Sequence, residues 1–383
     1  MKVGVTLFVQ NYTDWDRFEA AERGEPVASR PEYSDQRRFH DDLKIALAAE
    51  SLGYDSVWTV EHHFTPYTMV TNPLQYLTYI AGRTERVDLG TMVIVLPWHH
   101  PVHVAEDIAM LDSFMGPNRN LQVGFGRGLG KREFDGFNVD MSQTRDLFHE
   151  NLQIIAAALS NDSFSYEGKF YNIKDLAIRP TPPRKRGVED FYGAWGSPGS
   201  IGAIAGSGLK PLIIPQRRWE DYTGEIQEFA KERSKGGFSR PAAPKIAVWI
   251  YCARTDEEAR AGALQYLSQY GESGLRHYQM LGSHFAQTKG YESYAEVSKA
   301  FSEIDDPFKA QGEMMIDNNV YGSPKSCIEK MQRIAKAFDP SEVMLIFSYG
   351  KMTHEEAMNS MTLFSKECLP EIKSWKTAQD TLN

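Results

Sequence analysis

The sequence is poor in cysteine. Three residues, Cys252, Cys327 and Cys368, are spread over 383 positions, and no two of them form a C-x-x-C pair. Disulfide-stabilised folds and structural zinc sites need more cysteines or closely spaced ones. We therefore predict neither feature and expect the three thiols to be reduced and buried.

Long apolar runs and an excess of positive charge are missing too. No segment approaches the roughly 18 consecutive apolar residues of a membrane span, and the N-terminus leads into a strand-like segment without the pattern of a signal peptide. We expect no membrane association and a cytoplasmic location. The 42 basic residues are outnumbered by 51 acidic ones, for a net charge of −9, which argues against nucleic acid as a partner.

The chain does contain a repeated alternation of strand-like and helical segments. Residues 3–9 form a short apolar run typical of a buried parallel strand, and apolar residues recur at helical spacing over 35–52, before Gly53. Seven more strand-like runs lie at about 55–60, 88–96, 120–125, 190–195, 210–215, 245–252 and 342–347. Helical patterns lie at 103–115, 143–159, 199–207, 219–234, 256–269, 324–338 and 353–369. With no Gly/Ser linker, this alternation predicts an α/β fold, a single (β/α)₈ TIM barrel over residues 1–383.

Three stretches are too long for a plain barrel. Residues 10–34 follow the first strand, and residues 271–320 form a late excursion. Loops after strands lie over the carboxyl face, where ligands bind, so we predict a pocket wall for the first stretch and a lid for the second. Simple surface insertions are the alternative. Residues 163–178 have the pattern of a small structural hairpin.

The first chemically informative segment is Glu61-His62-His63, at the end of the second strand. A barrel places catalytic groups there, and this trio can act as acid or base, bind a metal, or form a hydrogen-bond network. A metal would need more ligands. A second histidine group follows the third strand without a carboxylate at ligand spacing, among prolines that indicate a rigid turn: Pro97, His99, His100, Pro101 and His103. We predict no metal site, and structural roles for His99 and His100.

Four glycines alternate at the end of the fourth strand: Gly124, Gly126, Gly128 and Gly130. In an extended chain they face one side and leave a bare strip of backbone that a flat ring or a phosphate could approach, with the charge of Arg127 beside it. The spacing matches neither a Rossmann nor a P-loop fingerprint. Tight packing inside the barrel is the alternative explanation.

After the fifth strand, Ser197 and Ser200 stand at the start of a helical pattern. Free backbone amides and the helix dipole favour an anion there, although ordinary helix capping explains the same residues. Arg127 and this helix start would lie on neighbouring strands of one face. Together they favour a cofactor that carries a phosphate.

The sequence resembles the bacterial luciferase-like flavin monooxygenases. The likeness spans nearly the whole barrel. It runs through Ala49-Glu50-Ser-Leu-Gly53-Tyr-Asp-Ser-Val-Trp58, Glu61-His62-His63-Phe64-Thr65, Asn72-Pro73, Leu89-Gly90-Thr91, Leu96-Pro97, His100-Pro101, Ala105-Glu106-Asp107, Leu111-Asp112, Gly126-Arg127-Gly128-Leu129 and Gly322-Ser323-Pro324.

The resemblance implies a TIM barrel that binds FMN in its reduced form at the carboxyl face. By it, His62 is the catalytic histidine that assists the oxygen chemistry of the flavin, and Met92-Val93 stands where the family has a cis peptide beneath the flavin ring. The residues that match phosphate-binding positions are Arg127, Gly196, Ser197 and Ser200, and those that match other flavin neighbours are Glu61, Leu129 and Ala194. The alternative for His62 is a structural role, buried and hydrogen-bonded to Glu61.

One departure concerns Gly126, where luciferase alpha chains carry a reactive cysteine. We expect the missing side chain to open space near the flavin. This argues against light emission with long-chain aldehydes and favours membership of the wider monooxygenase branch.

We therefore predict a two-component monooxygenase that takes reduced FMN from a separate flavin reductase and uses O₂ to oxygenate a small hydrophobic substrate, such as a terpene, ketone or aldehyde. The chain shows no nicotinamide fingerprint of its own. The resemblance also implies a homodimer formed through the early helices. The alternatives are an F420-dependent oxidoreductase of the same fold and a flavin-binding relative without catalysis.

Overall fold

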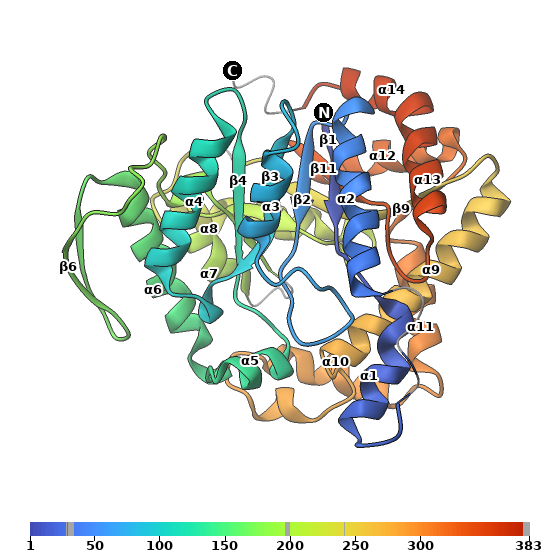
Figure 1. The fold of residues 1–383 in the computed structure, drawn as a ribbon, viewed down its shortest axis with the longest axis horizontal. Coiled ribbons are helices and arrows are strands. Elements are labelled where there is room, and N and C mark those ends of the chain that lie inside the picture. The colour runs from blue at the N-terminus through green and yellow to red at the C-terminus, as the bar shows by residue number, and fades with distance from the viewer. Residues whose placement is uncertain (28, 30–33, 196–199, 241, 378–383) are drawn as a thin grey trace.

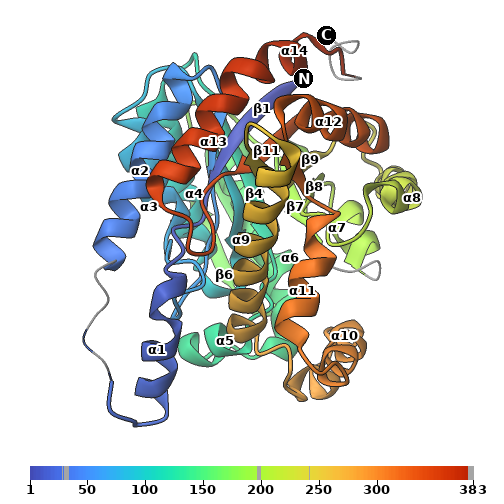
Figure 2. The ribbon, with the colours of Figure 1, turned by 90° about the vertical axis from the view of Figure 1, so that its right-hand side faces the viewer.

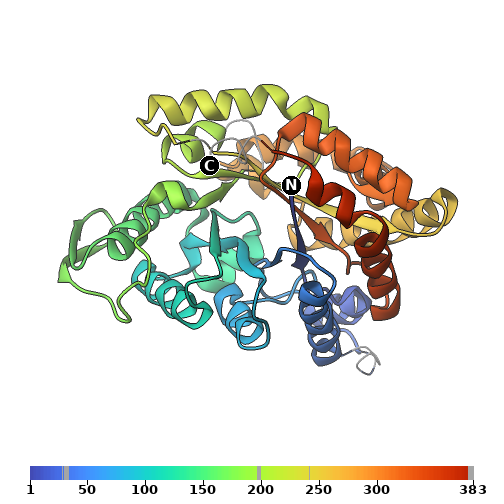
Figure 3. The same cartoon turned by 90° about the horizontal axis from the view of Figure 1, so that it is seen from above.

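The structure is a computed structural model that describes residues 1–27, 29, 34–195, 200–240 and 242–377. Its eight barrel strands are β1 (Lys2–Leu7), β2 (Ser56–Thr59), β3 (Asp88–Val95), β4 (Leu121–Gly126), β7 (Tyr192–Ala194), β8 (Lys210–Ile213), β9 (Lys245–Cys252) and β11 (Glu342–Ile346). They lie side by side in the order β9-β11-β1-β2-β3-β4-β7-β8, and the pairing of β8 with β9 closes the ring. All neighbours are parallel, so the predicted (β/α)₈ TIM barrel is confirmed (Figure 3).

The strands form where the sequence has short apolar runs because both faces of each strand are covered. In β1, Val5 lies opposite Leu345 of β11 on one side and Val57 of β2 on the other, and all three side chains are fully buried. A short strand, β10 (Val320–Gly322), pairs with β9 outside the ring. It was not predicted.

Helices surround the barrel (Figure 3). Those that match predicted patterns are α2 (Asp35–Ser51), α4 (Pro101–Met115), α6 (Thr144–Ser160), α7 (Ile201–Gly206), α8 (Thr223–Lys235), α9 (Asp256–His277), α12 (Pro324–Phe338) and α13 (His354–Glu367). Helix α3 (Pro73–Ala81) was not predicted, although it begins with a clear signal: Asn72 accepts a hydrogen bond from the amide of Gln75, and Pro73 stands in the first turn.

The predicted insertions lie mainly at one end of the barrel. Helix α1 (Trp15–Glu22) of the first insertion and helix α10 (Glu292–Ser302) of the late one occupy the lower end in Figures 1 and 2, where the strands finish, and the N-terminus lies at the opposite end. Helix α5 (Lys131–Phe137), which belongs to neither insertion, lies there too. Residues 271–320 are mostly helical, with the last turns of α9, then α10 and α11 (Pro307–Ile316). Residues 163–178 contain an antiparallel hairpin, β5 (Phe164–Glu167) and β6 (Asn172–Leu176), as predicted.

The first and last insertions contact each other. The indole of Trp15 donates a hydrogen bond to Ser273 Oγ at 2.5 Å, and Arg276 forms an ion pair with Asp16 at 3.3 Å. The loop after β1 is therefore braced by the last turns of α9.

The amino end of the barrel is closed by polar side chains. Lys245 and Glu342, both almost fully buried, form an ion pair at 2.5 Å, and Glu342 also accepts a hydrogen bond from Ser56. An open depression of about 830 Å³ lies beneath them, on the face opposite the insertions.

The cysteines and the apolar helices can be checked over the described residues. The three cysteines are free and buried, as predicted. Over the same residues, no helix is long and apolar enough to cross a membrane.

Candidate active site

Glu61 leaves the end of β2 and links two strands through their histidines. Its side chain is buried and accepts hydrogen bonds from His63 Nε2 at 3.1 Å, His99 Nε2 at 2.6 Å and the amide of Val95 at 2.7 Å. Burial alone would raise the pKa of Glu61, but the hydrogen bonds from the two histidines outweigh it and hold the pKa below its ordinary value. Glu61 is thus a satisfied carboxylate, and His99 has the structural role predicted for it.

His62 points away from Glu61. Its Nδ1 lies 3.1 Å from Oε1 of Glu133 on helix α5, and its Nε2 lies 3.3 Å from the hydroxyl of Tyr278. The expected structural alternative, a hydrogen bond between His62 and Glu61, is therefore wrong. Successive residues leave the strand in different directions, so Glu61 and His62 have separate partners.

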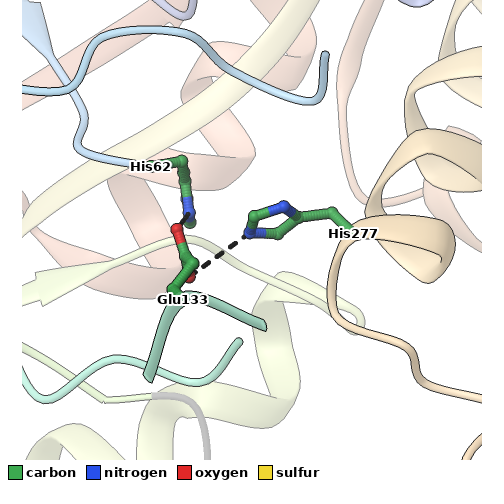
Figure 4. Close-up of side chains that lie close together, drawn as sticks. All are labelled: His62, Glu133 and His277. Atoms are coloured by element: carbon green, nitrogen blue, oxygen red, sulfur yellow. Dashed lines mark hydrogen bonds and ion pairs between the residues drawn. The ribbon is translucent and has the colours of Figure 1, made fainter. Parts of the chain in front are cut away.

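Glu133 is fully buried and joins His62 to a second histidine. It also accepts the backbone N–H of His63 at 2.8 Å, and its Oε2 lies 3.4 Å from Nε2 of His277, the last residue of α9 (Figure 4). Burial would raise the pKa of Glu133, but its contacts with His62 and His277 outweigh burial and hold the pKa far below its ordinary value.

His277 has no exposed surface. Burial lowers its pKa to about 4 despite the nearby Glu133, so its imidazole is neutral at physiological pH. Its Nδ1 forms a hydrogen bond with Thr65 Oγ1 at 2.7 Å, and the ring of Tyr67 stacks on it with centroids 4.7 Å apart.

Neither Glu133 nor His277 was predicted from the sequence. Glu133 lies only three residues beyond Gly130 and could have been noticed as an acidic residue just after the glycine row. His277 lies in a stretch whose only signal was its length. The fold brings both to the end of β2.

The glycine row does not leave an open strip. A β-carbon at Gly124 would lie 2.5 Å from the carbonyl oxygen of Thr91, and one at Gly126 would lie 2.4 Å from Cγ2 of Val93. Tight packing, the alternative explanation, is correct for these two positions. The expectation that Gly126 opens space beside the ring is also wrong, because Val93 fills that space.

The peptide bond between Met92 and Val93 is cis, as the resemblance implied. Met92 is buried, and Val93 is partly buried at the carboxyl half of β3. Leu129 and Ala194 are both partly buried, Leu129 against the insertion and Ala194 at the end of β7.

Arg127 follows β4 and reaches the late insertion. Its Nη2 donates to the carbonyl of Gly290 at 2.9 Å, and its guanidinium lies 4.1 Å from the ring centroid of Tyr291. Its Nη1 is buried and has no hydrogen-bond partner among the described residues. Because β4 pairs with β7, the segment that leads to α7 starts on the neighbouring strand, as predicted. Ser200 is the N-cap residue of α7, whereas Gly196 and Ser197 lie outside the described residues.

A family model for luciferase-like monooxygenases matches residues 24–339. The chain belongs to this family. One relative of this luciferase-like chain, the alkanal monooxygenase alpha chain of Photorhabdus luminescens, is 24% identical over 345 residues, which are 90% of this chain and 94% of that protein. 4-Hydroxyprotoasukamycin monooxygenase of Streptomyces nodosus subsp. asukaensis is also 24% identical, over 86% of this chain and 85% of that protein. An uncharacterized protein of Sinorhizobium fredii is 33% identical, but over only 39% of this chain and 46% of its own length.

Solved structures share the fold. Monooxygenase RslO1 from Streptomyces bottropensis superposes with a TM-score of 0.75 at 23% identity, covering 97% of this chain and 99% of that chain. The FMN complex of the oxygenating constituent of 3,6-diketocamphane monooxygenase from Pseudomonas putida superposes with a TM-score of 0.68 at 19% identity. The match covers 97% of this chain and 98% of that chain. An F420-dependent secondary alcohol dehydrogenase also superposes with a TM-score of 0.68, at 15% identity, and the match covers 97% of this chain and 99% of that chain.

Proposed function

We propose that this luciferase-like protein is the oxygenating component of a two-component monooxygenase, which takes reduced FMN from a separate reductase and uses O₂ to oxygenate a small hydrophobic substrate. The observation that carries the proposal is the pairing of a partly exposed His62 with the buried carboxylate of Glu133 at the carboxyl face. The monooxygenases aligned over most of the chain support the choice of reaction.

The residues present fit a phosphate-bearing cofactor. The buried, unpartnered Nη1 of Arg127 is a donor with a permanent positive charge, which a phosphate oxygen would satisfy. In the proposed complex, Arg127, Gly196, Ser197 and Ser200 hold the phosphate. The residues that border the flavin ring are Glu61, Met92, Val93, Leu129 and Ala194.

When bound, reduced FMN supplies the electrons that activate O₂. The task of His62 is to move a proton. Glu133 accepts the Nδ1 proton of His62, which leaves the Nε2 lone pair facing the hydroxyl of Tyr278. A carboxylate in this position fixes both the orientation and the tautomer of the imidazole. His62 can therefore take up or deliver a proton at Nε2 without turning.

Aromatic side chains near His62 favour an apolar substrate. The ring of Tyr67 lies 5.0 Å from that of His62, and Tyr270 contacts Tyr67, Phe8 and Trp249. Phe8 directly follows β1, Tyr67 lies in the loop after β2, Trp249 lies within β9 and Tyr270 lies on α9. Residues 271–320 would exclude water from this region, and their contact with Arg127 links that task to the phosphate site.

The early helices favour a homodimer. Large apolar side chains on α3 and α4 are exposed: Tyr79, Met110 and Phe114, the last with 63% of its surface accessible. We propose that a second copy covers them. Sedimentation of the native protein and of Phe114→Glu tests this, and an unchanged monomer in both would contradict it.

The function is tested by anaerobic titration with reduced and oxidised FMN, followed by oxygen uptake with a flavin reductase and a panel of terpenes, ketones and aldehydes. We expect tighter binding of reduced FMN and uptake only when reductase is present. Oxidation of NADH by the isolated protein at a useful rate would contradict the two-component scheme. Tight binding of F420 with alcohol oxidation would favour instead the activity suggested by the F420-dependent neighbour, and flavin binding without turnover would indicate a non-catalytic relative.

A further inference from the structure

Two clusters at the carboxyl face each combine one glutamate with two histidines, but they differ in how their polar atoms are satisfied. In the Glu61 cluster, His63 and His99 both donate to Oε1, and Oε2 accepts the amide of Val95. Both carboxylate oxygens are therefore satisfied by protein donors. This cluster needs no further ligand.

In the Glu133 cluster, by contrast, the polar atoms are not all satisfied by hydrogen bonds. Oε1 is near His62 Nδ1 and the amide of His63, but Oε2 of Glu133 and Nε2 of His277 have no hydrogen-bond partner among the described residues. These two buried atoms face each other at 3.4 Å (Figure 4). Their contact lacks hydrogen-bond geometry, and leaving two buried polar atoms unsatisfied is costly, so a ligand that contacts both would stabilise the cluster.

The geometry suits a cation. One ligand atom each from His62, Glu133 and His277 all lie within 4.8 Å of one another. Two imidazole nitrogens and one carboxylate oxygen are a common ligand set for zinc and other divalent transition metals, with remaining positions open to water or another ligand.

Outer contacts orient both imidazoles. Thr65 Oγ1 holds Nδ1 of His277 at 2.7 Å, so that Nε2 faces the cluster. The hydroxyl of Tyr278 stands 3.3 Å from Nε2 of His62, so that Nδ1 faces the cluster. Metal-binding histidines characteristically have their second nitrogen held in this way.

We infer that His62, Glu133 and His277 form a binding site for a divalent transition metal ion, with Zn²⁺ as the best-suited ion. The sequence could not predict this site because its ligands come from the loop after β2, from α5 and from the end of α9. The ion would occupy Nδ1 of His62 and displace the proton shared with Glu133. Metal binding and proton transfer by His62 would therefore exclude each other, and Zn²⁺ would inhibit the proposed monooxygenase.

The test uses the full chain, freed of metal with a chelator and titrated with Zn²⁺ by calorimetry in the absence of flavin and substrate. We expect one ion per chain for the wild type and loss of that binding in Glu133→Gln and His277→Gln. Thr65→Val should weaken binding by about 10- to 100-fold, because it removes only the outer contact. Since no flavin is present, failure of this test is independent of the proposed function.

Matched controls are His99→Gln, which alters the satisfied Glu61 cluster, and His103→Gln, which breaks the exposed ring pair of His100 and His103. Both should bind Zn²⁺ like the wild type. If His277→Gln does not fold, Co²⁺ binding to the wild type still tests the site, because it should give the visible absorption of a low-coordinate nitrogen and oxygen site without a thiolate band. No binding to the wild type, binding that survives Glu133→Gln, or binding lost in His103→Gln would overturn the inference.

Discussion

Val93 occupies the space that a side chain at position 126 would need, with its Cγ2 atom 2.4 Å from the place of a β-carbon on Gly126. We expect Gly126→Ala to lower the free energy of unfolding by about 1–3 kcal/mol, the usual effect of overpacking. In a Val93→Ala background, Gly126→Ala should lower the free energy of unfolding by less than half as much. Chemical denaturation of the four proteins measures this, and strictly additive losses would show that the two positions do not compete for space.

Removal of His62 tests its role as a proton carrier. We expect His62→Ala to retain FMN affinity but to lower the rate of product formation by about 10²- to 10⁴-fold and to release hydrogen peroxide instead. Glu133→Gln should shift the ratio of product to peroxide in the same direction, because it weakens the orientation of His62 without removing it. His103→Gln is the control. A normal ratio in His62→Ala with normal stability would remove His62 from the mechanism.

Arg127→Ala should weaken FMN binding by roughly 10- to 150-fold, the effect of losing about 1.5–3 kcal/mol from a charge-assisted contact. Arg127→Lys should recover only part of the affinity, since lysine lacks the bidentate fork. Arg145→Ala is the matched control because Arg145 also donates to the carbonyl of Gly290, at 3.4 Å. Flavin titrations that are equal for all three variants would place the phosphate elsewhere.

The buried ion pair at the amino end should dominate stability there. Lys245→Met leaves Glu342 as an unpaired buried charge and should lower the free energy of unfolding by about 3–5 kcal/mol. Lys2→Met removes a partner of Asp88, but the Lys2 side chain is 54% exposed, so the loss should be at most about 1 kcal/mol. Urea unfolding compares the two. Similar losses would contradict the difference in burial as their cause.

Asp42 should give stability a recognisable pH dependence. Burial raises its pKa to about 6, against hydrogen bonds from Ser348 and the amide of Val9 and the nearby charge of Arg38. A raised carboxyl pKa means that the folded state holds a proton which the unfolded state releases. The contribution of Asp42 to the free energy of unfolding therefore falls as pH rises from about 4 to 6. The loss is on the order of 3 kcal/mol. Asp42→Asn should remove this component from the curve of stability against pH, and parallel curves for both proteins would contradict the assignment.

The barrel was predictable because its signals are local. Each strand is a short apolar run, and most helices show apolar spacing within one segment, so all eight strands were found. Helix α3 was missed because its start is marked by a capping residue rather than by its pattern. The site was predictable only in part. His62 lies in a recognisable motif, but Glu133 and His277 acquire their roles only through the closure of the barrel.

The contacts of Trp15 with Ser273 and of Arg276 with Asp16 make the two long insertions a single structural module. The last turns of α9 carry these contacts and also His277. A change in length after β1 would therefore disturb the position of a histidine encoded some 250 residues later. Moving either insertion onto another barrel would require both segments to be moved together, and natural relatives should gain or lose them as a pair.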